Sequence, residues 1–187
     1  MSANTVPLQD QLDALARRVE HLESRVGSGT EFRAEFRAAD TPSTPALDPE
    51  AFWALEGVQA RRSDHPSTAQ GMVMLVGSLT LPDGGPVAWQ EGAGTAGLFE
   101  SDWSERAATF AALGHPVRLE LLRHILNGTH TTAELADIDG LGTTGQLHHH
   151  LRQLVAAGWV RQSGRGSYEV PAARIVPLLA GVLGAER

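Results

Sequence analysis

The chain of 187 residues is acidic, with 22 acidic and 15 basic side chains, and 42% of its residues are hydrophobic. It contains no cysteine, which excludes disulfides, thiolate metal ligands and thiol redox chemistry. It has no run of about 18 apolar residues and no signal-peptide pattern, so we expect no membrane span and a cytoplasmic protein.

The acidity is concentrated in residues 1–102, which hold 15 acidic and 7 basic side chains and a net charge of −8. Residues 103–187 hold 7 acidic and 8 basic side chains, a net charge of +1. A polyanionic partner is therefore compatible with the C-terminal half only.

A heptad pattern opens the chain. Apolar residues alternate steps of four and three at Leu8, Leu12, Leu15, Val19, Leu22 and Val26. Val at two of the three a positions and Leu at every d position favour a parallel dimeric coiled coil over residues 1–27. A helix that docks the same seam on its own chain is the alternative, because fewer than three heptads are marginal without a partner.

Residues 28–50 are rich in Gly, Ser, Thr and Pro, which predicts a linker. Asp48 followed by Pro49 then has the pattern of a helix N-cap with proline at the first helical position. We expect this helix to run to about Arg62, with Phe52 on its apolar face.

Residues 72–90 predict a β-hairpin, because two apolar segments flank the Pro82–Gly85 turn. An isolated hairpin is unstable in water. It must pack on the helix after Pro49, on the C-terminal domain, or on the same hairpin of a second chain. Trp89 is expected in the core or an interface rather than in a ligand cage, and residues 92–97 are expected to loosen the chain. These elements form an accessory region over residues 51–98.

The domain of residues 99–187 is expected to open with a helix near Trp103, capped by Ser101 or Asp102. It is expected to end with a helix between Ala172 and Leu183, entered at Pro177 because proline suits a first turn. This last segment is almost wholly apolar, so the core of its own subunit or a dimer partner must cover it.

Between these helices, residues 131–160 predict a helix-turn-helix. Leu135 and Ala136 lie on a short helix that Gly140 and Gly142 end, and Gly158 ends the second helix. The second helix carries one apolar stripe, made by Leu147, Leu151, Leu154 and Val155. Residues 159–170 then predict a strand, a Gly-Arg-Gly turn and a strand, which form a wing.

The polar surface of the second helix and the wing suggests DNA recognition. Gln can pair bidentately with adenine, and an Arg at the wing tip can reach a phosphate or the minor groove. Thr143 or Thr144 caps the helix, whose first turns usually contact base edges. The candidate DNA-contacting residues are Thr143, Thr144, Gln146, His148, His149, Arg152, Arg161 and Arg165.

The run from Ala112 to Leu126, then TTAELA, then HHHLRQLVAAGWV resembles the ArsR-like winged helix-turn-helix regulators of prokaryotes. The resemblance extends from Phe110 to about Leu183. It implies a homodimeric DNA-binding regulator in which the first and last helices of the domain form the dimer interface. Many metal-sensing members use Cys or paired acidic and His ligands, and this chain lacks Cys.

Metal binding and catalysis are not expected. Consecutive helical residues point about 100° apart, so the three residues His148, His149 and His150 cannot readily converge on one ion. His150 is expected to face inward as a hydrogen-bonded structural histidine. The chain has no catalytic signature such as a nucleophile elbow, phosphate-binding loop or His-Glu-x-x-His motif, and we predict neither an enzyme nor a cofactor.

The sequence thus predicts a mainly α-helical chain with small β elements, in which a winged helix-turn-helix domain follows a coiled-coil helix and a β-hairpin region. The predicted function is a homodimeric, sequence-specific transcriptional regulator that binds double-stranded DNA. The alternative is a winged-helix module that binds a partner protein, which the near-neutral charge of the domain keeps open. No small-molecule effector follows from the sequence.

Overall fold

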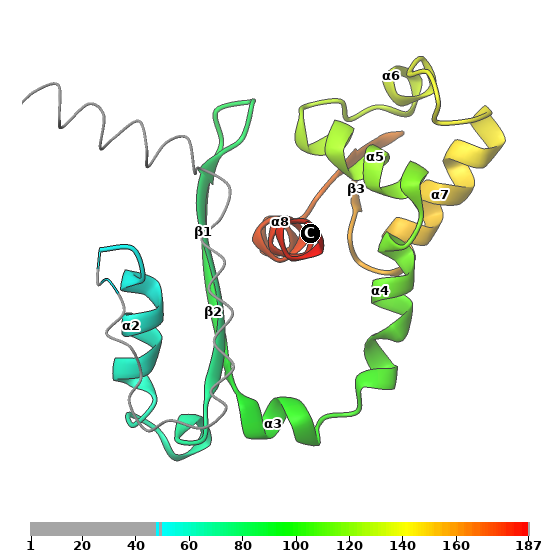
Figure 1. The fold of residues 1–187 in the computed structure, drawn as a ribbon. Coiled ribbons are helices and arrows are strands. Elements are labelled where there is room, and N and C mark those ends of the chain that lie inside the picture. Colours follow the sequence, from blue (N-terminus) through cyan, green and yellow to red (C-terminus); the bar gives the residue numbers. More distant parts are fainter. Residues whose placement is uncertain (1–47, 49, 187) are drawn as a thin grey trace, which may run out of the picture. The chain divides into compact units, whose positions relative to one another are not determined.

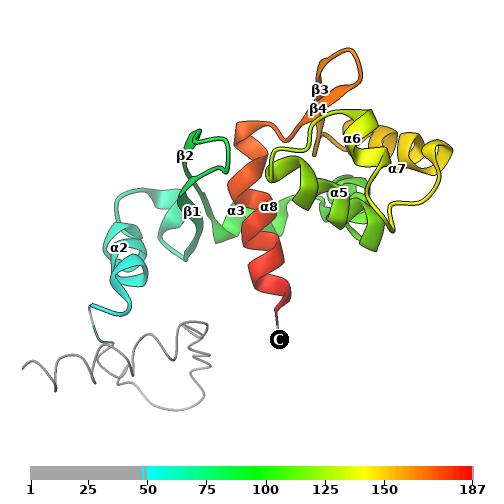
Figure 2. The same cartoon turned by 90° about the horizontal axis from the view of Figure 1, so that it is seen from above.

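The computed structural model describes residue 48 and residues 50–186, and Leu55–Arg187 form one compact unit. The predicted coiled-coil helix over residues 1–27 lies outside the described residues, as does nearly all of the predicted linker over residues 28–50. Both stay predictions. The described part of the chain is mainly helical and carries two small antiparallel hairpins, which confirms the predicted class (Figures 1 and 2).

The elements of the described residues are, in chain order, α2 (Trp53–Arg61), η1 (Pro66–Thr68), β1 (Met72–Thr80), β2 (Pro86–Gly94), α3 (Thr95–Glu100), η2 (Trp103–Arg106), α4 (Ala107–Leu113), α5 (Pro116–Leu126), α6 (Thr132–Ala136), α7 (Thr144–Ala156), β3 (Arg161–Gly164), β4 (Ser167–Glu169) and α8 (Ala172–Ala185). None of the helices in this part of the chain combines the length and apolarity that a membrane span needs.

The first described helix begins later than predicted, although Asp48 makes the bonds of a helix cap. Asp48 Oδ1 accepts a hydrogen bond from Glu50 N at 3.0 Å, and the Asp48 carbonyl accepts one from Phe52 N at 2.9 Å. A side chain that accepts from the second residue ahead, with a carbonyl that accepts from the fourth, is the bonding of an N-cap, as predicted for Asp48. The regular helix α2 nevertheless begins only at Trp53, so the predicted start is about four residues early.

The hairpin turn confirms the Asp-Gly signal. Leu81 N donates to Gly85 O at 2.9 Å, and Gly84 N donates to Leu81 O at 2.8 Å. Asp83 Oδ1 accepts from Gly85 N at 2.9 Å. Gly84 has a φ of +85°, a left-handed conformation that favours glycine.

The expectation that residues 92–97 loosen the chain was also wrong. Strand β2 continues to Gly94, which pairs with Met72, and α3 follows directly. A Cβ on Gly94 would lie 2.0 Å from Ser67 O, so glycine is needed here for a close backbone approach. Gly94 thus lets η1 pack against the hairpin, a tertiary contact that composition does not reveal.

The hairpin packs on α8, which selects the C-terminal domain among the three partners considered (Figures 1 and 2). A Cβ on Gly77 would lie 2.8 Å from both methyl groups of Val176. Trp89, opposite Gly77 in the register, packs against the buried core as predicted, and Val87 is buried beside it. The accessory hairpin and the winged domain therefore share one core.

Helix α8 begins at Ala172 rather than at Pro177, which lies inside the helix. Proline within a helix removes one backbone hydrogen bond. Ile175 and Val176, both before Pro177, are buried in the core. Their burial stabilises the first turns and extends the helix toward its N-terminus beyond the predicted start.

Candidate nucleic-acid interface

The turn between α6 and α7 is set by glycines and by capping boxes. Gly140 and Gly142 have φ values of +87° and +86°, so both adopt the left-handed conformation. Thr143, not Thr144, is the N-cap of α7. Its Oγ1 accepts from Gln146 N at 3.4 Å, and Gln146 Oε1 accepts from Thr143 N at 2.8 Å. This reciprocal pair satisfies two backbone donors and fixes where α7 starts.

Three leucines anchor α7 in the core. Leu147, Leu151 and Leu154 are almost completely buried, whereas Val155 is 39% exposed. The prediction that Val155 belongs to the buried stripe was wrong. Eight residues after Leu147, the helix has turned roughly 80° beyond that position, which places Val155 at the flank of α7.

All eight predicted DNA-contacting residues are exposed. Helical geometry places His149 and Arg152 opposite the buried leucines, so both lie on the outermost face of α7. His148 is rotated by about 100° from His149 and lies on a flank near Val155. Arg152 lies between His148 and His149 around the helix, four residues after the first and three after the second, so the three side chains share one broad exposed face.

The Gln146 side chain bonds to Thr143 of its own helix cap. The prediction that Gln146 reads a base did not take this bond into account. Gln146 Oε1 accepts from both the backbone N and the Oγ1 of Thr143, at 2.8 and 3.2 Å. A bidentate contact with adenine needs this same oxygen. The capping-box pattern Thr143-x-x-Gln146 was visible in the sequence and could have identified the role.

The wing is a short hairpin whose tip carries Arg165 and Gly166. Gly166 has a φ of +69°, as the tight turn requires. Arg161 lies opposite Glu169 and forms an ion pair with it across the two strands. Arg152 and Arg165 form no ion pair with any described residue. These two arginines are therefore the cations of α7 and the wing that remain free for phosphate.

The wing is joined to the start of α6, a connection that the sequence did not suggest. Thr131 forms an isolated antiparallel bridge with Ser167. Thr132 N donates to Gly166 O at 2.9 Å. Strand β4 consequently lies between β3 and the segment before α6, and the wing and the helix-turn-helix are held as one body.

His150 faces inward, as predicted, but it is not satisfied. Its ring lies 4.6 Å from that of His115 between centroids, and its Nδ1 is buried without a hydrogen-bond partner among the described residues. Burial, and then the nearby His115 and Arg118, lower the pKa of His150 below its usual value of 6.5. The neutral imidazole is thus favoured at this packed junction of α5 and α7.

The described residues contain no group of three or more His, Asp or Glu side chains placed to hold a metal ion. Trp159, which follows α7, is held in place by a hydrogen bond and a cation–π contact. Its Nε1 donates to Thr109 O at 2.8 Å, and the Arg174 guanidinium lies 5.1 Å from its ring centroid. These contacts tie the end of α7 to α4 and α8.

Comparison with known proteins supports this assignment of the C-terminal half. A family model described as a helix-turn-helix domain matches residues 113–162, which span α5 to β3. Searches of curated proteins and of solved structures gave no match. Residues 113–162 are therefore a helix-turn-helix domain, which indicates a DNA-binding regulator.

Proposed function

We propose that the chain is a homodimeric transcriptional regulator of the ArsR-like class that binds specific double-stranded DNA sequences. The observation that carries the proposal is the helix-turn-helix at residues 113–162, whose second helix exposes a polar face beside a wing. In this arrangement α7 enters the major groove, and Arg165 contacts a phosphate or the minor groove. The protein acts by binding and not by catalysis.

Dimerisation is supported by apolar side chains that the single chain leaves uncovered. Trp103 of η2 and Phe110 of α4 are 63% and 68% exposed. Aromatic side chains are enriched in protein interfaces relative to the rest of the surface. The two free arginines of α7 and the wing, Arg152 and Arg165, provide few phosphate contacts, so a second protomer adds the DNA affinity that one protomer lacks.

The alternative function, a winged-helix module that binds a partner protein, is favoured by one specific observation. The ion pair between Arg161 and Glu169 neutralises a wing cation that would otherwise face the phosphate backbone. Together with the net charge of +1 over residues 103–187, it leaves only a modest basic face.

A selection from random double-stranded DNA by the purified full chain separates the two functions. A homodimer with two recognition helices should enrich an inverted repeat whose half-sites are about 10 base pairs apart from centre to centre. Enrichment of one unrepeated half-site would contradict dimeric binding. Recovery of DNA without any sequence preference would contradict specific regulation and favour the protein-binding module.

A further inference from the structure

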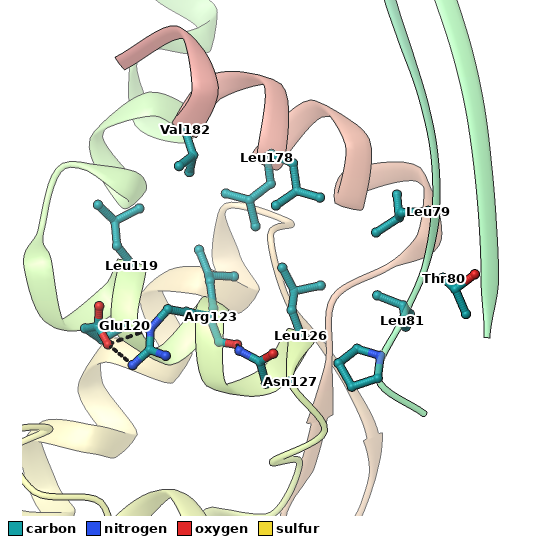
Figure 3. Close-up of a pocket in the computed structure, with 13 residues that line it drawn as sticks. Leu79, Thr80, Leu81, Leu119, Glu120, Arg123, Leu126, Asn127, Leu178 and Val182 are labelled. Carbon is teal, nitrogen blue, oxygen red and sulfur yellow. Dashed lines mark hydrogen bonds and ion pairs between the residues drawn. The ribbon is translucent and has the colours of Figure 1, made fainter. Parts of the chain in front are cut away.

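An apolar groove lies between α5, α8 and the end of β1 (Figure 3). Its volume is about 460 Å³, within the range of roughly 300–1,000 Å³ typical of small-molecule pockets. Leu122 and Leu178 form a buried floor, and Leu119, Leu179 and Val182 form a half-exposed rim. None of the lining residues belongs to α7 or the wing, so the groove is separate from the candidate DNA interface.

The chemistry of the lining specifies the kind of occupant. Nine of the thirteen lining residues are Leu, Val or Pro, and none is aromatic. Such a wall gives dispersion and apolar burial without a stacking platform. The groove therefore suits an aliphatic molecule better than a planar aromatic one.

The charged edge of the groove is internally neutralised. Arg123 donates through Nε and Nη2 to Glu120 Oε2, at 2.9 and 2.6 Å. This hydrogen bond lowers the pKa of Glu120 and raises the pKa of Arg123, so both remain ionised and paired near neutral pH. Asn127, the neighbouring amide, already donates to the Arg123 carbonyl at 2.8 Å. The edge thus offers no net charge to attract an anion or a cation.

The most exposed large apolar side chains of the described residues lie outside the groove. Phe99, Phe110 and Leu183 are each at least 68% exposed, more than any Leu or Val that lines the groove, and none of them lines it. The groove is instead a concave site that the hairpin tip closes at Leu81 and Pro82. A small molecule can reach its floor, whereas a helix or sheet of a second chain meets mainly its rim.

We propose that this groove binds a small, uncharged aliphatic molecule. Binding depends on burial in the groove and not on DNA, so the inference goes beyond the proposed regulator function and can be tested separately from it.

The test titrates the full chain with n-alkanols by isothermal titration calorimetry, and n-octanol serves as the uncharged aliphatic probe. We expect alkanol affinity to rise about fourfold per methylene until the groove is full. An alkanoate and an alkylammonium of the same length should bind more weakly, because a charge must be desolvated without a partner.

Two tryptophan variants locate the binding. Val182 lines the groove and is 48% exposed, whereas Leu183, the next residue of α8, is 68% exposed and does not line it. Val182→Trp should fill the groove and weaken probe binding at least about tenfold, while Leu183→Trp should change it less than about twofold. Because both positions are exposed, both variants should fold, and circular dichroism melting checks this.

Three results would overturn the proposal. The first is a folded Val182→Trp protein that binds the probe as tightly as the wild type. The second is an alkanoate or alkylammonium that binds more tightly than the alkanol. The third is a wild-type dimer that excludes the probe while Val182→Trp becomes monomeric in sedimentation equilibrium, which would assign the groove to a second copy of the chain.

Discussion

Substitution of Gln146 separates helix capping from base recognition. The Gln146 carboxamide accepts from the backbone N of Thr143 at 2.8 Å, so Gln146→Ala leaves that donor without its partner in the capping box. We expect a loss of about 1 kcal/mol in the free energy of unfolding, the usual cost of losing a helix cap. Gln146→Glu keeps an acceptor and places a negative charge at the N-terminus of α7, where the helix dipole favours it. This variant should be as stable as the wild type.

Gln146→Glu should be the more stable of the two variants but should have the lower affinity for DNA. A carboxylate at the N-terminus of the recognition helix repels phosphate, so Gln146→Glu should bind all DNA more weakly than Gln146→Ala does. Thermal melting should place Gln146→Ala about 3–5 °C below the wild type. Gln153→Ala, an exposed change on the same helix, is the matched control. Equal melting temperatures for Gln146→Ala and Gln153→Ala would refute the capping argument.

Three further changes test the packing, a titration and the assembly. Gly77→Ala should cost about 1–3 kcal/mol of unfolding free energy, because the added Cβ overpacks Val176, and an unchanged denaturant midpoint would show that the hairpin does not press on α8. The pKa of His150 is lowered in the folded state, so the unfolded chain binds more protons and the free energy of unfolding should fall as pH drops below about 6.5. This fall should be smaller in His150→Asn than in the control His148→Asn, and identical pH profiles for the two variants would contradict the argument. Phe110→Ser should give folded monomers in sedimentation equilibrium, whereas a persistent dimer would place the interface elsewhere.

The parts of the fold that local chemistry determines were predictable. Gly140, Gly142 and Gly158 all have positive φ values, as the turn and the helix end require. The apolar spacing of α7 located the buried leucines, and the Asp-Gly turn located the first hairpin. In each case the signal and the structure it determines lie within a few residues of each other.

The errors arose where distant residues decide the outcome. Pro177 has the local chemistry of a helix start, yet burial of Ile175 and Val176 extends α8 toward its N-terminus. Gly94 looks like a loop residue, but it is needed for the approach of Ser67.

In the candidate site, too, the sequence predicted what depends on neighbouring residues but not what depends on distant ones. Exposure of the predicted residues follows from helical spacing, whereas the pairing of Arg161 with Glu169 and the bridge from Thr131 to Ser167 depend on how the strands meet. The unsatisfied Nδ1 of His150 depends on what packs around it.

The central claim is that α7 and the wing bind DNA, and the salt dependence of DNA affinity tests it most directly. With Arg152 and Arg165 free on each protomer, a dimer should give a slope of log affinity against log salt of about −3.6. Arg165→Ala should flatten the slope to about −1.8. Arg61→Ala, which removes the same charge from α2, should leave the slope unchanged. A slope near zero, or equal slopes for Arg165→Ala and the wild type, would contradict the account.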